Sequence, residues 1–203
     1  MTTAAEFHAA EGVEDWRVLY HVVAAHFRTR SFAEGVALVD EINRLPLDAP
    51  PRMDLRDAGV TVTLTARDIA AARLISAAAA QVGLLSEPAA VQLVNVTIDA
   101  LVGAEVLPFW CAVLGYRQVG DDVAGDPRGR GPGIGLQPLD VARPQRNRVH
   151  LDVAVPHDQA EARVAAALTA GGRLVSDAHA PKWWILADAE GNEACVATWQ
   201  GRG

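Results

Sequence analysis

Cysteine, clustered positive charge and long apolar runs are all scarce in this chain of 203 residues. Cys111 and Cys195 are its two cysteines, too few for a disulfide scaffold and without the paired spacing of a zinc site. No basic run accompanies the formal net charge of −7, so nucleic acid is not expected as a partner, because binding its phosphates needs clustered Lys and Arg. No apolar stretch approaches a membrane span, and the first residues show no basic and apolar leader. These absences predict a cytoplasmic protein without a membrane partner.

The composition that remains is that of an ordinary globular protein, with 50% hydrophobic and 21% charged residues. Strand and helix signals alternate through the first half. We expect one or two strands at 14–27, where the alanines leave a helix as the alternative, and then a helix opened by Ser31 and Glu34 as a capping box. A strand at 59–68 and a helix at about 68–83 follow. Prolines exclude a helix from 45–53, and 86–92 has the composition of a linker.

The second half contains an internal repeat. A strand at 95–99 is followed by a helix through 108–115 and a further strand, and the same order recurs from a strand at 150–154 through a helix at 159–172. Pro108 favours the first turn of the earlier helix, which moves its expected start towards 105–108. The offset is about 55 residues, which favours duplication of one supersecondary unit. Two such copies would share a core, and we expect a site between them.

Both copies open with a strand that has one polar face. Asn95, Thr97 and Asp99 alternate with apolar residues in the first copy, as His150 and Asp152 do in the stretch RVHLDVAV at 148–155 of the second. A solvated face is the ordinary explanation of such a pattern. Matching polar faces on two repeated strands favour the alternative, that these side chains line a ligand cavity.

Five further residues are candidates for the same cavity. Glu193 and Cys195 share one face of a predicted strand at 193–197, and Gln137 lies in another stretch at 135–139. The alternative for Glu193 is a purely structural role in the turn GNE at 191–193. Trp183 and Trp184 are adjacent, so only one of them can enter the cavity, where it would stack on a planar ligand; core packing is the alternative.

The stretches VTID at 96–99, FWCAVLGY at 109–116, RVHLDVAV at 148–155 and WWILADAEGNEACV at 183–196 resemble the glyoxalase-like branch of the vicinal oxygen chelate superfamily. The resemblance covers about residues 92–199. It implies two βαβββ modules that form a cupped mixed sheet, often with a metal held by one side chain from each of four strands.

By register, this resemblance puts Asn95, Gln137, His150 and Cys195 at the four metal positions. The superfamily uses His, Glu or Gln there, so a neutral amide and a thiol replace two of the usual ligands. Such a set matches no common divalent-metal preference. We therefore expect no metal and no other cofactor.

The first half, about residues 7–84, resembles the pterin-4a-carbinolamine dehydratases through DWRV, HFRTRSFAEGVALVDEI and the VTVTLT strand. The family's catalytic His-His-Pro reads Ala49-Pro50-Pro51 here, and Ala66-Arg67-Asp68 stands where a further histidine follows the strand. Pro and Ala supply no proton for the departing hydroxyl. The fold class is therefore α+β, with a degenerate dehydratase-like domain at 1–87 and a glyoxalase-like domain at 92–203. The first domain's relatives assemble through helices and strand edges, which implies a homodimer.

Three functions remain open. As a lyase-like enzyme, the second domain would use His150, Asp152 and Asp99 for metal-free proton transfer, with Asp152 as the base. As a binding module, it would sequester a small organic molecule, as antibiotic-binding members of the superfamily do. The third function is carbinolamine dehydration by substitute residues of the first domain such as Asp54 and Arg56, which otherwise belong to a solvated loop.

Overall fold

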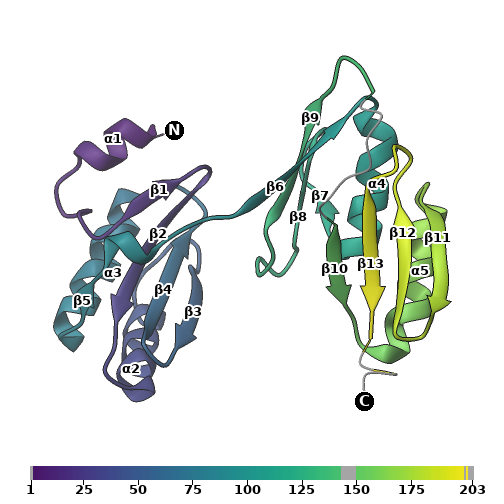
Figure 1. Cartoon of the computed structure of the whole chain (residues 1–203). Coiled ribbons are helices and arrows are strands. Elements are labelled where there is room, and N and C mark those ends of the chain that lie inside the picture. The colour runs from purple at the N-terminus through teal and green to yellow at the C-terminus, as the bar shows by residue number, and fades with distance from the viewer. Residues whose placement is uncertain (1, 143–149, 199, 201–203) are drawn as a thin grey trace. The chain divides into compact units, whose positions relative to one another are not determined.

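A computed structural model describes residues 2–142, 150–198 and 200 of the chain. Contacts divide the chain into two compact units, Met1–Leu93 and Val94–Gly203 (Figure 1). Each unit buries its own hydrophobic core. Both units are mixed α and β structure. None of the helices in the described part of the chain is long and apolar enough to cross a membrane.

The first unit is an antiparallel sheet accompanied by three α-helices. Its elements are α1 (Ala4–Ala9), β1 (Arg17–Leu19), β2 (Val22–Arg28), α2 (Phe32–Asn43), β3 (Arg52–Arg56), β4 (Gly59–Leu64), α3 (Ile69–Val82), β5 (Leu85–Ser86) and the 3₁₀ turn η1 (Pro88–Ala90). The strands lie in the order β1-β2-β4-β3, and β5 pairs with β2. Ser86, at the start of the stretch expected as a linker, therefore belongs to this sheet, where it pairs with Phe27.

Apolar alternation correctly predicts the central strand of this sheet. Val60, Val62 and Leu64 of β4 are buried at 0%, 0% and 5% exposure, while Thr61 and Thr63 between them are half-buried. The region 14–27 forms two strands, β1 and β2, separated by a turn in which Tyr20 has a φ of 53°. The helix expected at about 68–83 is α3.

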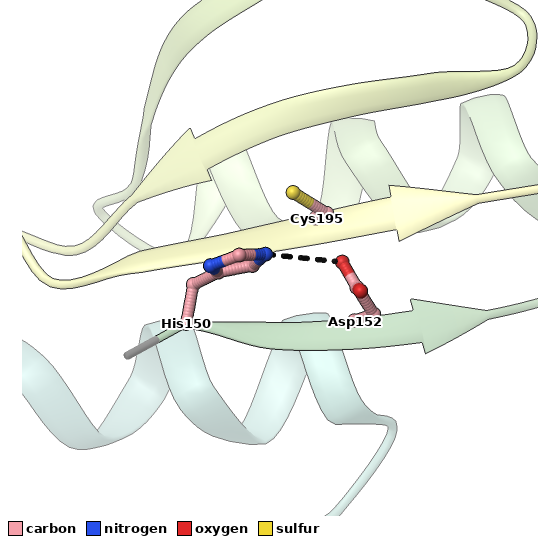
Figure 2. A group of neighbouring side chains, drawn as sticks. All are labelled: His150, Asp152 and Cys195. Atoms are coloured by element: carbon pink, nitrogen blue, oxygen red, sulfur yellow. Dashed lines mark ion pairs between the residues drawn. The ribbon is translucent and has the colours of Figure 1, made fainter. Parts of the chain in front are cut away.

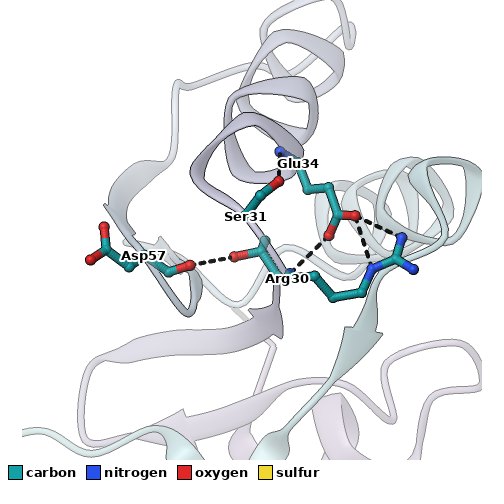
Figure 3. A network of polar contacts seen from close by, with 5 residues as sticks. Arg30, Ser31, Glu34 and Asp57 are labelled. Atoms are coloured by element: carbon teal, nitrogen blue, oxygen red, sulfur yellow. Dashed lines mark hydrogen bonds and ion pairs between the residues drawn. The ribbon is translucent and has the colours of Figure 1, made fainter.

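The capping box predicted for α2 forms only in part. The Ser31 hydroxyl accepts the backbone N–H of Glu34 at 3.3 Å, as expected for an N-cap. The Glu34 carboxylate, however, accepts the backbone N–H of Arg30 at 2.9 Å and pairs with the Arg30 guanidinium at 2.6 Å (Figure 3). Close by, the Thr29 hydroxyl donates to the carbonyl oxygen of Asp57 at 3.2 Å. The cap is thus joined to an ion pair at the start of the helix.

The second unit confirms the internal repeat. The first module contains β6 (Asn95–Ala100), α4 (Gly103–Leu114), β7 (Arg117–Gln118), β8 (Val123–Gly125) and β9 (Gly133–Pro138); the second contains β10 (Leu151–Ala154), the 3₁₀ turn η2 (His157–Gln159), α5 (Ala160–Thr169), β11 (Arg173–His179), β12 (Trp183–Ala187) and β13 (Glu193–Ala197). The strand orders β6-β9-β8-β7 and β10-β13-β12-β11 are equivalent. In each module the first and last strands pair in parallel and the other pairs are antiparallel.

Two sheets of mixed orientation result, each with four strands. Their closure into one cupped sheet stays a prediction. The stretch RVHLDVAV begins at residues 148 and 149, which lie outside the described part of the chain, so the start of that strand stays a prediction too. One core joins the modules, since buried residues of α4, α5, β9 and β13 belong to the same hydrophobic cluster.

Helix α4 begins earlier than its proline suggests. Pro108 favours the first turn of a helix, which predicted a start between 105 and 108, but α4 begins at Gly103 and Pro108 lies inside it. An interior proline has no N–H to donate and costs a helix about 3 kcal/mol. Burial of Val106, Phe109 and Trp110 at 0–2% exposure offsets that cost. Packing therefore decides where this helix begins.

Candidate functional site

An imidazole, a carboxylate and a thiol meet on neighbouring strands of the second module. Figure 2 shows His150 directly before β10, Asp152 on β10 and Cys195 on β13. The His150 Nε2 and Asp152 Oδ1 atoms are 3.5 Å apart, Asp152 pairs with Cys195 across the ladder, and one ligand atom of each residue lies within 4.8 Å of the others. The His150 and Asp152 side chains are 53% and 72% exposed, so both are open to a ligand.

Strand alternation explains why these three side chains share one face. Ala194 and Val196 of β13 are fully buried in the core, and Leu151 of β10 packs against the same cluster. Successive side chains of a strand point to opposite faces. Asp152 and Cys195 therefore lie on the face away from the core. Whether this face lines a cavity stays a prediction.

The electrostatics of the cluster keep the thiol neutral. Partial burial of Cys195, together with the charge of Asp152, a hydrogen bond to that carboxylate and the charge of Glu193, raises the pKa of the thiol to about 11. Each of these effects disfavours the thiolate. At neutral pH, Cys195 is therefore a hydrogen-bond donor to Asp152 and a poor nucleophile.

The two tryptophans lie on opposite faces, as their adjacency predicts. Trp184 packs against the core cluster. Trp183 pairs with Ala197 and falls on the face that carries Cys195. Its ring centroid lies 4.4 Å from that of His179, and the Lys182 ammonium lies 5.2 Å from the ring centroid. Trp183 is thus the tryptophan that stays a candidate for stacking, and a ligand would compete with these neighbours for its ring.

Of the other predicted residues, Glu193 is half-buried at the start of β13 in the second module, and the rest belong to the first module. Asn95 and Thr97 of β6 are exposed and Asp99 is half-buried, whereas Val96 and Ile98 pack against the core. Gln137 pairs with Asp99. The cluster of His, Cys and carboxylate groups found in the described residues contains His150, Asp152 and Cys195 but not Asp99. Of the three predicted catalytic residues, the structure therefore brings His150 and Asp152 together and places Asp99 on another strand pair.

The pairing of strands places Gln137 beside Asp99, two residues beyond the position that the repeat makes equivalent to Cys195. Val96 pairs with Ile134 just as Leu151 pairs with Ala194, so the residue of β9 that corresponds to Cys195 is Gly135. Gln137 lies two residues further along and corresponds to Ala197. A Cβ added at Gly135 would meet no heavy atom within 4 Å, so this position has room for a side chain that the sequence does not supply.

The comparisons with known proteins give the second unit a family. A family model described as a glyoxalase-like domain matches residues 95–197, just over half of the chain. The chain belongs to this glyoxalase-like family. No curated protein matches the chain.

Several solved structures are similar to the glyoxalase-like domain. A glyoxalase/bleomycin resistance protein/dioxygenase family enzyme from Burkholderia phytofirmans PsJN is 17% identical with a TM-score of 0.43, covering 53% of this chain and 98% of that chain. The fosfomycin resistance protein FosX from Mesorhizobium loti is 8% identical with a TM-score of 0.42 (52% and 90% covered). A glyoxalase-related enzyme from Fulvimarina pelagi is 19% identical with a TM-score of 0.40 (53% and 88% covered).

The metal that the superfamily often holds does not fit the glyoxalase-like domain of this chain. The first module offers the neutral amide of Asn95 and, at the position equivalent to Cys195, a glycine without a ligand atom. The second module offers His150 and the thiol of Cys195, which an amide and a glycine do not complete to a common divalent-metal set. Asp152 adds a third donor from the same module. The four superfamily positions thus lack a complete ligand set.

Two carboxylates that the sequence analysis missed organise the turn between β12 and β13. Asp188 is completely buried, and Glu190 reaches the first module through two hydrogen bonds. The segment Asp188–Asn192 contains Gly191 at a φ of 94°, a conformation that favours glycine. An acidic residue three positions before a glycine is a turn signal that could have drawn attention to this segment.

A separate hollow of about 330 Å³ lies beside α4. Ala104, Leu107, Pro108, Gln118 and Asp121 line it. It shares no residue with the His150, Asp152 and Cys195 cluster.

Proposed function

We propose that the glyoxalase-like domain binds a small organic molecule over the polar face of β10 and β13 and transfers a proton on it without a metal. One observation carries the proposal: the Asp152 carboxylate has both the His150 imidazole, at 3.5 Å, and the Cys195 thiol as neighbours. A carboxylate held by two partners on a solvent-accessible face is suited to accept a proton from a ligand. The reaction class would be lyase-like proton abstraction.

The three side chains have separate roles in this proposal. Asp152 is the base; His150 stabilises its charge when the imidazole is protonated, and accepts the proton from the Asp152 carboxyl when the imidazole is neutral. Cys195 donates a hydrogen bond to Asp152 and orients the carboxylate. Positioned acid and base groups contribute about 10²- to 10⁴-fold to such steps.

Native mass spectrometry of the purified chain tests the proposal, because it detects a small molecule retained by the protein. We expect Asp152→Asn to weaken retention or turnover of that molecule about tenfold or more, since a charge-assisted hydrogen bond contributes more than a neutral one. Asp158→Asn, which removes an equal charge from the exposed turn η2, is the matched control and should leave retention unchanged. Equal retention by the Asp152→Asn variant and the unchanged chain would contradict the assignment.

Binding without chemistry is the second candidate function. The protonated Cys195 thiol is a poor nucleophile, and the exposure of Asp152 leaves its carboxylate in contact with water, both of which suit a domain that sequesters its ligand. Mass analysis distinguishes the two functions. A retained molecule that leaves with unchanged mass after prolonged incubation supports sequestration, and a product of different mass supports the enzyme.

A separate experiment tests whether the site holds a metal. We expect elemental analysis after mild purification to find less than about one-tenth of an equivalent of zinc, nickel or iron, because the ligand set is incomplete. His150→Ala is the control, and its metal content should equal that of the unchanged chain. One stoichiometric metal that disappears with His150→Ala would overturn the prediction.

We infer that the first unit is a dehydratase-like domain with little or no dehydratase activity. The elements β1, α2 and β4 overlap the stretches DWRV, HFRTRSFAEGVALVDEI and VTVTLT that carry the resemblance. At the position of the catalytic triplet, Ala49-Pro50-Pro51 supplies no acid–base group. Asp54 and Arg56 pair with each other at 2.8 Å, with side chains 59% and 78% exposed, which favours a solvated surface. Rapid dehydration of a pterin carbinolamine in a stopped-flow assay, abolished by Asp54→Asn, would show that substitute residues act.

The homodimer stays a prediction, and the first unit is the part proposed to form it. Sedimentation analysis of the full chain decides between one and two copies.

A further inference from the structure

A turn of the second module is bonded directly to the first module. Glu190, between β12 and β13, accepts the backbone N–H of Leu101 at 2.9 Å and that of Val102 at 2.8 Å. Val102 is the N-cap of α4 and provides no side-chain cap. The first N–H groups of a helix have no partner within the helix, and negative charge is favourable there. Glu190 therefore caps a helix that lies 88 residues earlier in the sequence.

Asp188 fixes the same turn from inside the protein. Its carboxylate is fully buried and accepts the indole N–H of Trp110 in α4 at 3.0 Å. The same carboxylate accepts the backbone N–H groups of Glu190 at 3.0 Å and Asn192 at 2.8 Å, and the Asn192 side-chain amide at 2.7 Å. A buried carboxylate with two donors on each oxygen holds the turn in one conformation, because moving the turn would break hydrogen bonds that buried polar groups cannot replace.

This turn leads without a break into the strand that carries the site. Glu193, the residue after Asn192, begins β13, and Cys195 follows two residues later opposite Asp152. We propose that Asp188 and Glu190 form a latch, residues 188–192, which holds β13 against α4 and so positions Cys195 beside Asp152 and His150. Glu190 is a positioning residue, since it does not belong to the cluster. This role is independent of the proposed reaction, because it concerns the geometry of the cluster and not the ligand.

Alkylation of Cys195 by iodoacetamide tests the latch without any ligand. The experiment uses the full chain with Cys111→Ala, so that Cys195 is the only thiol. We expect Glu190→Ala to speed alkylation at pH 8 by about threefold or more, because a displaced β13 exposes the thiol and separates it from Asp152, and both changes favour the thiolate. Glu190→Gln, which keeps the size of the side chain but loses the charge, should give a smaller increase in the same direction.

Two matched controls separate positioning from helix stability. Glu105→Ala removes another acidic residue from the first turn of α4 without touching the turn at 188–192, and it should leave the alkylation rate unchanged. Val102→Asp, added to Glu190→Ala, gives α4 a local cap. We expect this double variant to recover thermal stability by circular dichroism while Cys195 stays fast to alkylate.

Either of two results would overturn the inference. Alkylation that remains slow in both Glu190→Ala and Glu190→Gln would show that Glu190 does not position β13. Alkylation that returns to the original rate in the double variant would show that Glu190 acts only as a helix cap.

Discussion

Partial burial of the Cys195 thiol, together with the adjacent Asp152 carboxylate, should make the fold less stable at alkaline pH. The pKa of Cys195 is raised from about 9 to about 11 in the folded chain. A group whose pKa is higher in the folded state contributes stability that is complete below the unfolded pKa and is lost as the pH rises through the folded pKa. The free energy of unfolding should therefore fall between pH 9 and about 11.

Denaturant unfolding at several pH values measures this dependence. Cys111 and Tyr116 also have pKa values raised by burial and contribute a decline of the same sign, so the comparison must isolate Cys195. We expect Cys195→Ala, made in a Cys111→Ala background, to make the decline between pH 9 and 11 shallower than in the Cys111→Ala variant alone. Parallel curves for these two variants would show that Cys195 titrates normally.

Single residues show how far local pattern predicts the site. Alternation alone placed His150 and Asp152 on one face, because the period of a strand is a local property. The partner of a parallel strand is not local, so the sequence did not show that Gly135 lies at the position equivalent to Cys195 while Gln137 lies opposite Asp99. Asp188 was missed for the same reason: its indole partner, Trp110, lies 78 residues away.

Among the elements, helix α2 allows a direct measurement of how much its N-cap contributes to stability. We expect Ser31→Ala to lower the free energy of unfolding of the first unit by about 0.5–2 kcal/mol, because it leaves the Glu34 N–H without its side-chain acceptor. Arg30→Ala removes only the exposed ion pair with Glu34, which contributes about 0.5 kcal/mol or less. Equal losses in the two variants, measured by urea unfolding, would show that the cap contributes no more than the ion pair.

Mutations on the two faces of the strands in the second module should have opposite effects on stability and on ligand affinity. Leu186 of β12 is completely buried, so Leu186→Ala should cost about 2–5 kcal/mol of stability and leave ligand affinity unchanged at temperatures where the protein is folded. Asp152→Ala should do the reverse, since its side chain is 72% exposed. Leu151 packs against the core but is only partly buried, which makes Leu186 the sharper probe. A large stability loss with Asp152→Ala would contradict the separation of the two faces.

Elements with strong periodicity could be predicted, and those decided by packing could not. β4 and α3 follow from their alternating and helical patterns. The start of α4 was misplaced because proline rules describe an isolated helix, whereas Phe109 and Trp110 gain more from burial than the proline costs. The 3-residue strand β1 has too few residues for its pattern to define its ends.

For the whole molecule, the repeat at about 55 residues was the informative signal, because it predicted two equivalent modules before any strand pairing was known. The structure has those modules in the second unit, with the same strand order in each. Sequence could not predict the latch at 188–192, which depends on contacts between the modules.

Because each unit has its own hydrophobic core, we expect the two units to unfold separately. The buried cluster of the first unit contains residues from Phe7 to Leu84, and that of the second contains residues from Ala100 to Val196. We therefore expect residues 94–203, expressed alone, to keep their fold, with a free energy of unfolding within about 0.5 kcal/mol of its value in the full chain, as for independent sites. Marker variants assign the transitions: Val62→Ala should shift only the transition of the first unit, and Leu186→Ala only that of the second. A single transition that both variants shift equally would show that the chain unfolds as one cooperative body.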